Sequence, residues 1–285
     1  MRIDGHTRLA GVIAKPIKHS ISPFIHNMAY HLTDTNAVYL ALEVDPKDLG
    51  KAVENIKLYH MLGANVSMPY KTEVIQFLDE LDETAREVGA VNTIINRHGW
   101  LIGYNTDGVG FFKSLPDFNL KGKNLTILGA GGGASAIISQ AVKEGVKRVF
   151  VFSRSKHLSE TEDRLTQLSK RLSHPIVVQA IEDLPALDTA VSQSALFVNA
   201  TGVGMDGKSL PIPNSFIFPK HILVADIAYS PMKTPFLQMA SEQGISTING
   251  LGMLLYQADR AFELMTGKAM PTEPIKNALL KHFAE

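Results

Sequence analysis

The sequence predicts an α/β protein built from mostly parallel sheets in two domains. Short apolar segments rich in β-branched residues alternate with longer segments of helical periodicity along the chain, which is the pattern of repeated strand–helix–strand units. A length of 285 residues suits one large or two ordinary domains. Near residue 125 the pattern restarts at the most glycine-rich segment of the chain, which indicates the start of a second domain.

The first part of the chain carries short strands, helices that begin near prolines, and a hairpin. Ser22-Pro23 and Asp45-Pro46 each pair a capping residue with a proline suited to the first helical turn, and Pro69 is placed to open a third helix. Arg97-His98-Gly99 is a turn sequence between two strand-like segments. We expect strands at 8–14, 38–44, 64–67, 91–96 and 100–104, and helices at 22–32, 49–61 and 73–81.

The second part repeats the strand–helix alternation more regularly. We expect strands at 125–128, 149–152, 176–180, 196–200 and 222–227. Apolar residues trace one helical face over 250–265, and a last helix follows Pro271 or Pro274. These last two helices are long enough to pack back on the first domain.

Composition excludes several functional classes. Lys plus Arg number 28 and so do Asp plus Glu, so no overall field attracts the chain to nucleic acid or to an anionic membrane. Cysteine is absent, which excludes disulfides, thiolate nucleophiles, Cys-ligated zinc and iron–sulfur clusters. The N-terminus lacks the apolar segment of a signal peptide, and no stretch of about 18 apolar residues occurs. We expect a cytoplasmic protein.

A glycine-rich turn at residues 129–134 points to a nucleotide. It matches G-x-G-x-x-A, follows the strand at 125–128 and precedes the helical stretch 137–142. Such glycines allow a tight turn and close approach to a pyrophosphate, which the helix N-terminus attracts. The sequence therefore predicts dinucleotide binding in a doubly wound, Rossmann-like domain. The expected contacts are Gly129, Ala130, Gly131, Gly132, Gly133 and Ala134.

The end of the next strand favours NADP over NAD. NAD-binding folds usually place an Asp or Glu there for the ribose 2′-hydroxyl. This chain has Ser153, Arg154, Ser155 and Lys156 instead, which suit a 2′-phosphate. The alternative is that the two cations are ordinary surface charges, and use of NAD stays open.

Four polar segments end strands of the first part: 19–23, 65–71, 89–93 and 103–108. Each has an ordinary explanation, such as a helix cap or a turn. Because ligands of open α/β sheets bind outside the carboxyl ends of the strands, the four together predict one site facing the nucleotide. His19 and His26 lie beside one of these segments, but without further ligands we expect no metal.

In these segments the chain resembles the shikimate dehydrogenases. The resemblance spans nearly the whole chain, in order, and rests on 20–23, 65–71, 89–93, 104–108, the glycine turn, 199–205, 226–231 and 250–257. It implies that Lys71 and Asp107 are the catalytic pair. It implies substrate contacts from Ser20, Ser22, Ser67, Asn92, Tyr229 and Gln257, and further cofactor contacts from Thr201, Gly202, Met205 and Gly250.

The resemblance implies a substrate-binding domain of residues 1–106 plus 258–285 and an NADP-binding domain of residues 107–257, with the site between them. The implied reaction is reversible reduction of 3-dehydroshikimate to shikimate with NADPH. Family members specific for shikimate commonly carry threonine and phenylalanine where this chain has Ser67 and Tyr70. A quinate/shikimate dehydrogenase using NAD or NADP is therefore one alternative, and a cofactor-binding regulatory module without turnover is another. Monomer and homodimer both stay open.

The chemistry of the reaction suits a lysine–aspartate pair. An ordinary lysine has a pKa of about 10.4, so at neutral pH it is an ammonium that can polarise and protonate a ketone. A neighbouring carboxylate favours that charged form further. The pair therefore favours reduction, and oxidation needs the neutral amine.

Overall fold

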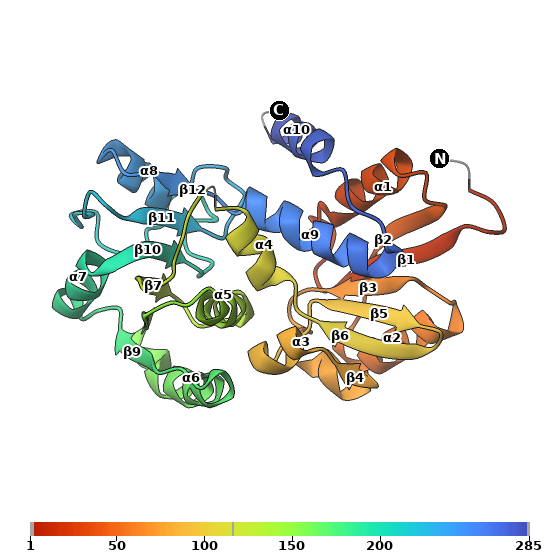
Figure 1. Cartoon of the computed structure of the whole chain (residues 1–285), viewed down its shortest axis with the longest axis horizontal. Helices are drawn as coiled ribbons and strands as arrows, with labels where there is room; N and C mark the ends of the chain where they lie inside the picture. The colour runs from red at the N-terminus through yellow and green to blue at the C-terminus, as the bar shows by residue number, and fades with distance from the viewer. Residues whose placement is uncertain (1–2, 116, 284–285) are drawn as a thin grey trace. The chain divides into compact units, whose positions relative to one another are not determined.

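The computed structural model describes residues 3–115 and 117–283 and divides into two compact units. Unit 1 consists of residues 1–106 and 255–285, and unit 2 of residues 107–254. Each unit is built around its own six-stranded sheet (Figure 1). The predicted α/β class is confirmed. The assignment of substrate to one part of the chain and NADP to the other stays a prediction at this stage.

The sheet of unit 1 is mixed. Strand β1 pairs in parallel with β2 and β3, whereas β5 pairs antiparallel with both β3 and β6. The spatial order is β2-β1-β3-β5-β6-β4. The strands are β1 (Arg8–Ala14), β2 (Ala37–Glu43), β3 (Gly63–Val66), β4 (Glu80–Leu81), β5 (Thr93–Arg97) and β6 (Trp100–Tyr104). The helices are α1 (Ser22–Leu32), α2 (Leu49–Leu58), α3 (Glu83–Val88) and α10 (Thr272–His282), with the 3₁₀ turns η1 (Pro46–Asp48) and η2 (Glu73–Phe77); α9 (Leu251–Thr266) begins in unit 2 and continues into unit 1.

The sheet of unit 2 is entirely parallel, in the order β12-β11-β10-β7-β8-β9. The chain starts in the middle at β7, proceeds outward to β9, and then crosses to β10 on the other side of β7. The strands are β7 (Asn124–Leu128), β8 (Arg148–Ser153), β9 (Ile176–Ala180), β10 (Ser194–Asn199), β11 (Leu223–Asp226) and β12 (Thr247–Ile248). The helices are α4 (Asp107–Lys113), α5 (Gly132–Lys143), α6 (Leu158–Leu172), α7 (Leu184–Ser192) and α8 (Pro235–Glu242), with the 3₁₀ turn η3 (Ser155–His157). This is the doubly wound order, whose reversal between β7 and β10 opens a ligand crevice.

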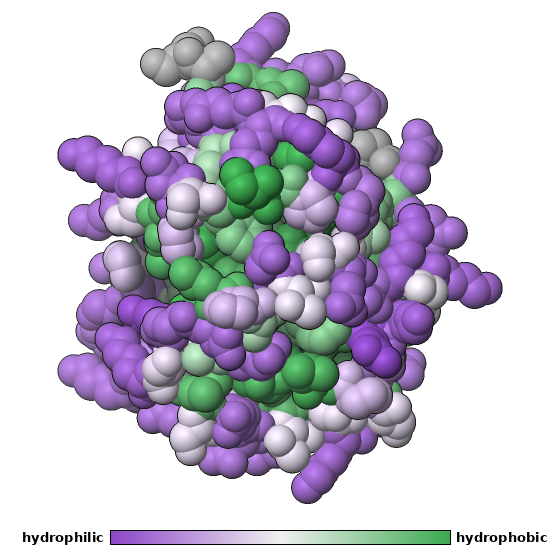
Figure 2. All heavy atoms as spheres, turned by 90° about the vertical axis from the view of Figure 1, so that its left-hand side faces the viewer, coloured by the Kyte–Doolittle hydropathy of each residue, from purple (hydrophilic) through white to green (hydrophobic). Residues whose placement is uncertain are grey.

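Two apolar cores cover the two faces of the unit 2 sheet. Ile127 and Val151 belong to one core with Ile137 of α5, whereas Leu128 and Phe152, the next residues of the same strands, belong to the other. This follows from the twofold periodicity of a strand, which sends neighbouring side chains to opposite faces. On the outside, Figure 2 shows a face of the molecule where hydrophilic side chains separate the apolar ones into small patches. In residues 3–115 and 117–283, no helix is long and apolar enough to cross a membrane.

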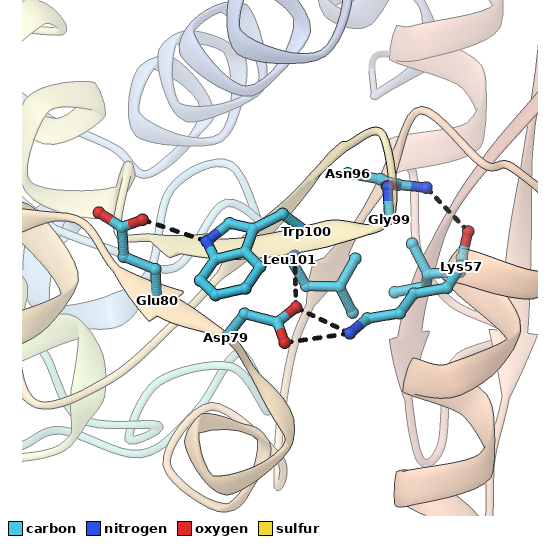
Figure 3. Close-up of polar contacts among 8 residues, drawn as sticks. Lys57, Asp79, Glu80, Asn96, Gly99, Trp100 and Leu101 are labelled. Carbon is cyan, nitrogen blue, oxygen red and sulfur yellow. Dashed lines mark hydrogen bonds and ion pairs between the residues drawn. The ribbon is translucent and has the colours of Figure 1, made fainter.

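The predicted helix at 73–81 is wrong. Only the 3₁₀ turn η2 forms there, and the chain then continues as β4, whose Glu80 pairs with Ile102 at the sheet edge. Figure 3 shows why the edge is preferred: the Asp79 carboxylate accepts the Leu101 N–H (2.7 Å) and pairs with the Lys57 ammonium (2.8 Å). The indole of Trp100 also donates to Glu80 (3.2 Å). These contacts with distant residues outweigh the local helical periodicity.

The two predicted caps are also corrected. Helix α1 begins at Ser22 itself, so its N-cap is Ile21, and the Ser22 N–H donates to the Ser20 hydroxyl (3.3 Å). Asp45 stands at the N-cap of η1, but its side chain makes no capping hydrogen bond and pairs with the Lys15 ammonium instead. The remaining strands and helices that were predicted with bounds are confirmed to within a few residues. Helices α3 and α4 and strands β4 and β12 were not predicted, and α6, α7 and α8 were predicted only as an alternation with the strands, without bounds.

A buried histidine lies on the inner face of α1 in unit 1. His26 is fully buried and stacks on Tyr39 of β2, with ring centroids 4.2 Å apart and planes 3° apart. Among the residues that the structure describes, neither nitrogen of His26 nor the hydroxyl of Tyr30 has a hydrogen-bond partner. Burial lowers the pKa of His26 to about 3. The imidazole is therefore neutral in the folded protein across the range where a free histidine titrates.

This histidine makes the fold sensitive to acid. Below pH 6.5 the unfolded chain takes up a proton at His26 that the folded chain does not, so stability falls as pH falls. Between about pH 7 and about pH 5 this group alone lowers the free energy of unfolding by about 2 kcal/mol. Urea unfolding at the two pH values measures the loss. His26→Phe keeps the ring on Tyr39 and should remove most of the difference; an unchanged pH dependence in that variant contradicts the assignment.

Candidate active site

The glycine turn of unit 2 has the shape that an anionic group requires. Gly129 follows β7 with φ +88°, and a Cβ there would lie 2.9 Å from the Thr201 methyl group. Gly131 and Gly132 are exposed at the start of α5, and a Cβ built on Gly131 meets nothing within 4 Å. The first N–H groups of α5 therefore open onto free space with no acidic side chain in the first turn. The pyrophosphate contacts predicted for this turn stay predictions, and Ala130 and Ala134 among them are buried.

The loop after β10, on the other side of the crevice, is held by Asn199. Its Oδ1 accepts from the N–H (3.1 Å) and the hydroxyl (2.6 Å) of Thr201. Its Nδ2 donates to the Val203 carbonyl (3.1 Å) and to the Asp226 carboxylate (2.9 Å). Thr201 and Gly202, both predicted cofactor contacts, thus lie in a loop whose shape is fixed from beneath by a fully buried amide.

Asp226, at the end of β11, connects that loop to the next one. Besides the Asn199 amide, its carboxylate accepts from the Thr234 hydroxyl (2.8 Å) and the Ala228 N–H (2.9 Å). The residue is 1% exposed, and burial raises its pKa while its hydrogen-bond donors oppose that rise. Sequence reasoning assigned no role to Asn199 or Asp226, although both lay in segments that carried the resemblance.

Met205 and Gly250, the other predicted cofactor residues of these loops, have different surroundings in the structure. Met205 is 59% exposed, and its sulfur lies 4.0 Å from the place of a Cβ on Gly202. A Cβ on Gly250 would lie 2.0 Å from the Ile227 carbonyl oxygen, and the Gly250 N–H donates to Ala228 (2.9 Å). Gly250 is thus required by close backbone packing, whatever its contact with a cofactor.

The residues predicted to hold a 2′-phosphate lie at the end of β8. Arg154 and Lys156 are exposed, and Ser153 shares a hydrogen bond with Thr161 (3.1 Å). A carboxylate from another part of the chain also reaches this segment, which sequence reasoning did not predict. Glu182, from the turn after β9, accepts both the N–H (3.0 Å) and the hydroxyl (2.7 Å) of Ser155.

In unit 1, the predicted substrate serines lie at the carboxyl ends of the central strands. Ser67 directly follows β3, and its N–H donates to Ile13 of β1 (2.9 Å). Ser20 and Ser22 lie between β1 and α1, joined by the hydrogen bond already described, with Ser22 in the first turn of α1. All three are partly exposed. Tyr70, where family members commonly have phenylalanine, is fully buried and donates its hydroxyl to Val44 (2.5 Å).

A chain of buried neutral groups lies beneath these serines. The Tyr39 hydroxyl donates to Asn65 (2.6 Å), whose amide donates to Thr93 (3.0 Å). Thr93 donates to Asn92 (3.0 Å), and the Asn92 amide contacts Thr106 through its N–H donor (2.9 Å) and its oxygen acceptor (2.9 Å). Asn92 is 2% exposed. Sequence reasoning assigned it to substrate, but several of its hydrogen bonds hold the protein itself together; Asn65 was missed as an individual residue.

This network fixes the backbone on both sides of the predicted catalytic residues. The Lys71 carbonyl accepts the Val91 N–H (2.7 Å), one residue before Asn92. Asp107 begins α4, directly after Thr106, and is 6% exposed. The catalytic roles of Lys71 and Asp107 stay predictions, as do the substrate contacts of Tyr229, after β11, and Gln257 in α9. Burial raises the pKa of Tyr229.

No group of three or more His, Asp or Glu side chains within the described ranges, 3–115 and 117–283, is arranged to hold a metal ion. The predicted site residues instead carry amides, hydroxyls and, at Lys71 and Asp107, an ammonium and a carboxylate.

Comparisons with known proteins identify the family of this chain. Residues 12–94 match the model of the shikimate dehydrogenase substrate binding domain, and residues 250–280 match that of the shikimate 5′-dehydrogenase C-terminal domain. The shikimate dehydrogenase (NADP⁺) of Streptococcus gordonii is 68% identical over 281 residues, covering 99% of each chain. The chain belongs to the shikimate dehydrogenase family.

Solved structures of shikimate dehydrogenases share the whole fold. The shikimate 5-dehydrogenase of Listeria monocytogenes, determined with shikimate and NAD, superposes with a TM-score of 0.91 at 40% identity, covering 98% of each chain. The Thermus thermophilus enzyme, determined with NADP(H) and shikimate, gives a TM-score of 0.83 at 29% identity, covering 96% of this chain and 99% of that one. The resemblance read from the sequence, and with it the two-domain α/β fold, is confirmed.

Asp226 should be a main support of the nucleotide side of the site. Asp226→Asn replaces one of the two carboxylate oxygens with an NH₂ donor, and because the three donors are shared between both oxygens, at least one buried donor loses its acceptor. We expect a loss of about 2–3 kcal/mol in the free energy of unfolding, measured by urea denaturation. Asp188→Asn on the exposed face of α7 is the matched control and should change stability little. Equal stability of the two variants would contradict the role given to Asp226.

Proposed function

We propose that this chain is a shikimate dehydrogenase that reversibly reduces 3-dehydroshikimate to shikimate with NADPH, in the cytoplasm. The observation that carries the proposal is the 68% identity, over nearly the full length of both chains, to an enzyme of that name. The retained Lys71 and Asp107 favour an active enzyme over a regulatory module, since a module that only binds cofactor has no need of a proton-transfer pair. The cofactor supplies or accepts the hydride when bound.

Lys71 is the proposed proton donor and acceptor. During reduction, the ammonium donates to the oxygen formed from the ketone, and during oxidation the neutral amine accepts the proton of the alcohol. Proton transfer by a positioned side chain contributes about 100-fold to 10,000-fold to a rate. The Val91 N–H on the Lys71 carbonyl holds the backbone of this residue in place.

Asp107 is the proposed partner that orients Lys71 and contacts the substrate ring. Its backbone follows directly from Thr106, which two hydrogen bonds tie to Asn92. Because the same network holds Val91 and Asn92 next to Lys71, the two ionisable residues are carried on backbone segments that are linked to each other through unit 1. A carboxylate in this role favours the ammonium form of the lysine.

The substrate carboxylate is proposed to bind Ser20 and Ser22 at the N-terminus of α1. Hydroxyls and N–H groups at a helix N-terminus bind an anion without a full positive charge. We therefore expect modest affinity, since neutral donors are weaker than a bidentate arginine. Ser67, Asn92, Tyr229 and Gln257 are proposed to select the ring hydroxyls.

The glycine turn and the start of α5 are proposed to hold the cofactor pyrophosphate. The open space at Gly131 and the absence of acidic residues in the first turn of α5 support this. Arg154 is proposed to pair with the 2′-phosphate of NADP, and Met205 to lie beside the nicotinamide. Whether the enzyme acts as a monomer or a homodimer is left to measurement.

Replacing the proposed proton donor should slow the chemical step. Lys71→Met removes the ammonium but keeps much of the side-chain volume, so we expect kcat to fall by about 100-fold or more while KM for shikimate changes little. Steady-state assays with shikimate and NADP⁺ measure both constants. Lys47→Met, at an exposed lysine, is the control. A large rise in KM with unchanged kcat would make Lys71 a binding residue instead.

The direction of the reaction should set its pH dependence. Oxidation consumes the neutral amine, whereas reduction consumes the ammonium, so raising the pH should speed oxidation of shikimate and slow reduction of 3-dehydroshikimate. Initial rates in both directions between about pH 6.5 and about pH 10 test this, a range that reaches the ordinary pKa of lysine. A flat oxidation profile would remove Lys71 as the proton acceptor.

The same assays separate the alternatives. Turnover of quinate at a rate close to that of shikimate identifies a quinate/shikimate dehydrogenase. Cofactor binding without turnover of either acid identifies the regulatory module and overturns the proposal.

A further inference from the structure

The strands β8 and β9 end side by side, which brings a distant glutamate to the predicted 2′-phosphate site. Ser153 is in register with Ala180, and the Ile181 N–H donates to the Ser153 carbonyl (2.8 Å). The Asp183 N–H then closes a turn onto Ala180 (3.1 Å). The residue between these two anchors is Glu182, whose backbone is therefore fixed next to the segment that follows β8.

The Glu182 side chain uses both donors of Ser155. One carboxylate oxygen accepts the backbone N–H (3.0 Å) and the hydroxyl (2.7 Å). A serine hydroxyl has a single proton, so with Glu182 in place Ser155 has none to give to a phosphate. The Ser155 hydroxyl, and after it other hydrogen bonds and the Arg154 guanidinium, lower the pKa of Glu182, so the carboxylate is ionised at neutral pH.

We propose that Glu182 determines the balance between NADP and NAD in this enzyme. The inference rests on the proposed function, in which the 2′-phosphate lies at the end of β8. A glutamate carboxylate beside the ribose repels a 2′-phosphate and accepts a hydrogen bond from a free 2′-hydroxyl. Arg154 attracts the phosphate, so the two residues act in opposite directions on the same group.

The position of this carboxylate differs from the usual arrangement. In NAD-binding folds the acidic residue stands at the end of the second strand, about 20 residues after the glycine turn. That position here is held by Ser153 and Arg154, and the carboxylate arrives instead from the end of the third strand. The chain thus keeps a cation for NADP and supplies, from elsewhere, an acceptor for NAD.

Equilibrium binding of both cofactors tests the proposal without relying on turnover. Calorimetric titration of the full-length protein with NADP⁺ and NAD⁺ gives Kd for the wild type, Glu182→Gln and the control Glu54→Gln, an exposed glutamate on α2. The glutamine side chain still accepts from Ser155 but carries no charge. We expect NADP⁺ to bind the Glu182→Gln variant about fivefold more tightly and NAD⁺ not to gain, with Glu54→Gln indistinguishable from wild type.

Added salt and a second variant distinguish an effect of the Glu182 charge from an effect on the structure of the turn. The gain for NADP⁺ should shrink in about 0.5 M salt, where surface charges are screened. Arg154→Ala should act in the opposite direction and weaken NADP⁺ selectively. Thermal unfolding of each variant checks that the turn after β9 still folds. Glu182→Ala lacks both the charge and the acceptor, so its difference from Glu182→Gln shows the effect of losing the contact with Ser155.

Two results overturn the inference. If Glu182→Gln leaves the ratio of the two Kd values unchanged, the carboxylate does not select between the cofactors. If both cofactors bind more weakly by the same factor, Glu182 only supports the turn. Neither result affects the proposed function, whereas a wild-type protein that binds neither cofactor and oxidises no shikimate would overturn the proposed function and this inference together.

Discussion

The buried amide of Asn92 is the contact on which the arrangement of unit 1 depends. It joins the end of β3, through Thr93 and Asn65, to Thr106, the last residue before α4. Val66 also donates its N–H to the Asn92 carbonyl (2.8 Å). Each member of this network has a partner within it, so replacing any one of them strands a buried donor or acceptor. The backbone segments bearing Lys71 and Asp107 owe their positions to groups that do no chemistry themselves.

In unit 2 a glycine and two buried polar side chains hold the loops at the strand ends in position. Its crevice lies where the strand order reverses between β7 and β10, and Gly129 lets the two strand ends approach until no Cβ fits between them. The loop after β10 then has to be held open beside a helix N-terminus that carries no side-chain ligand of its own. Asn199 and Asp226 hold this loop. Their side chains form hydrogen bonds with each other, with Thr201 and with Thr234. These two buried polar side chains support the loop and leave the first N–H groups of α5 open.

The regular alternation of strands and helices was predictable from the sequence. The competition between a helix and a sheet edge at 73–81 was not. The parallel strands of unit 2 and the hairpin at 93–104 follow from apolar runs and from a turn in which His98 and Gly99 adopt positive φ. The helix expected at 73–81 failed because a sheet edge, set by Asp79 and Leu101, offered better hydrogen bonds than helical periodicity could reveal. The candidate site segments were predictable because polar residues at strand ends form a visible pattern. What the sequence could not show is that Asn92 and Ser155, which are predicted to contact ligands, form hydrogen bonds within the protein, or that Glu182 reaches a segment 27 residues away.

The groups that support the fold of unit 1 differ chemically from the residues that are proposed to transfer a proton. The network around Asn92 consists of amides and hydroxyls, which keep their protonation state across the physiological range, and burial raises the pKa of Tyr39 well above that of a free tyrosine. A change of pH within that range therefore leaves the protonation state of this network unchanged. His26 touches the network only by stacking on the ring face of Tyr39, whose hydroxyl bonds to Asn65. Its titration bears on whether unit 1 stays folded and not on the proton transfer proposed for Lys71, so these two expected effects of pH are assigned to different residues and are separable by experiment.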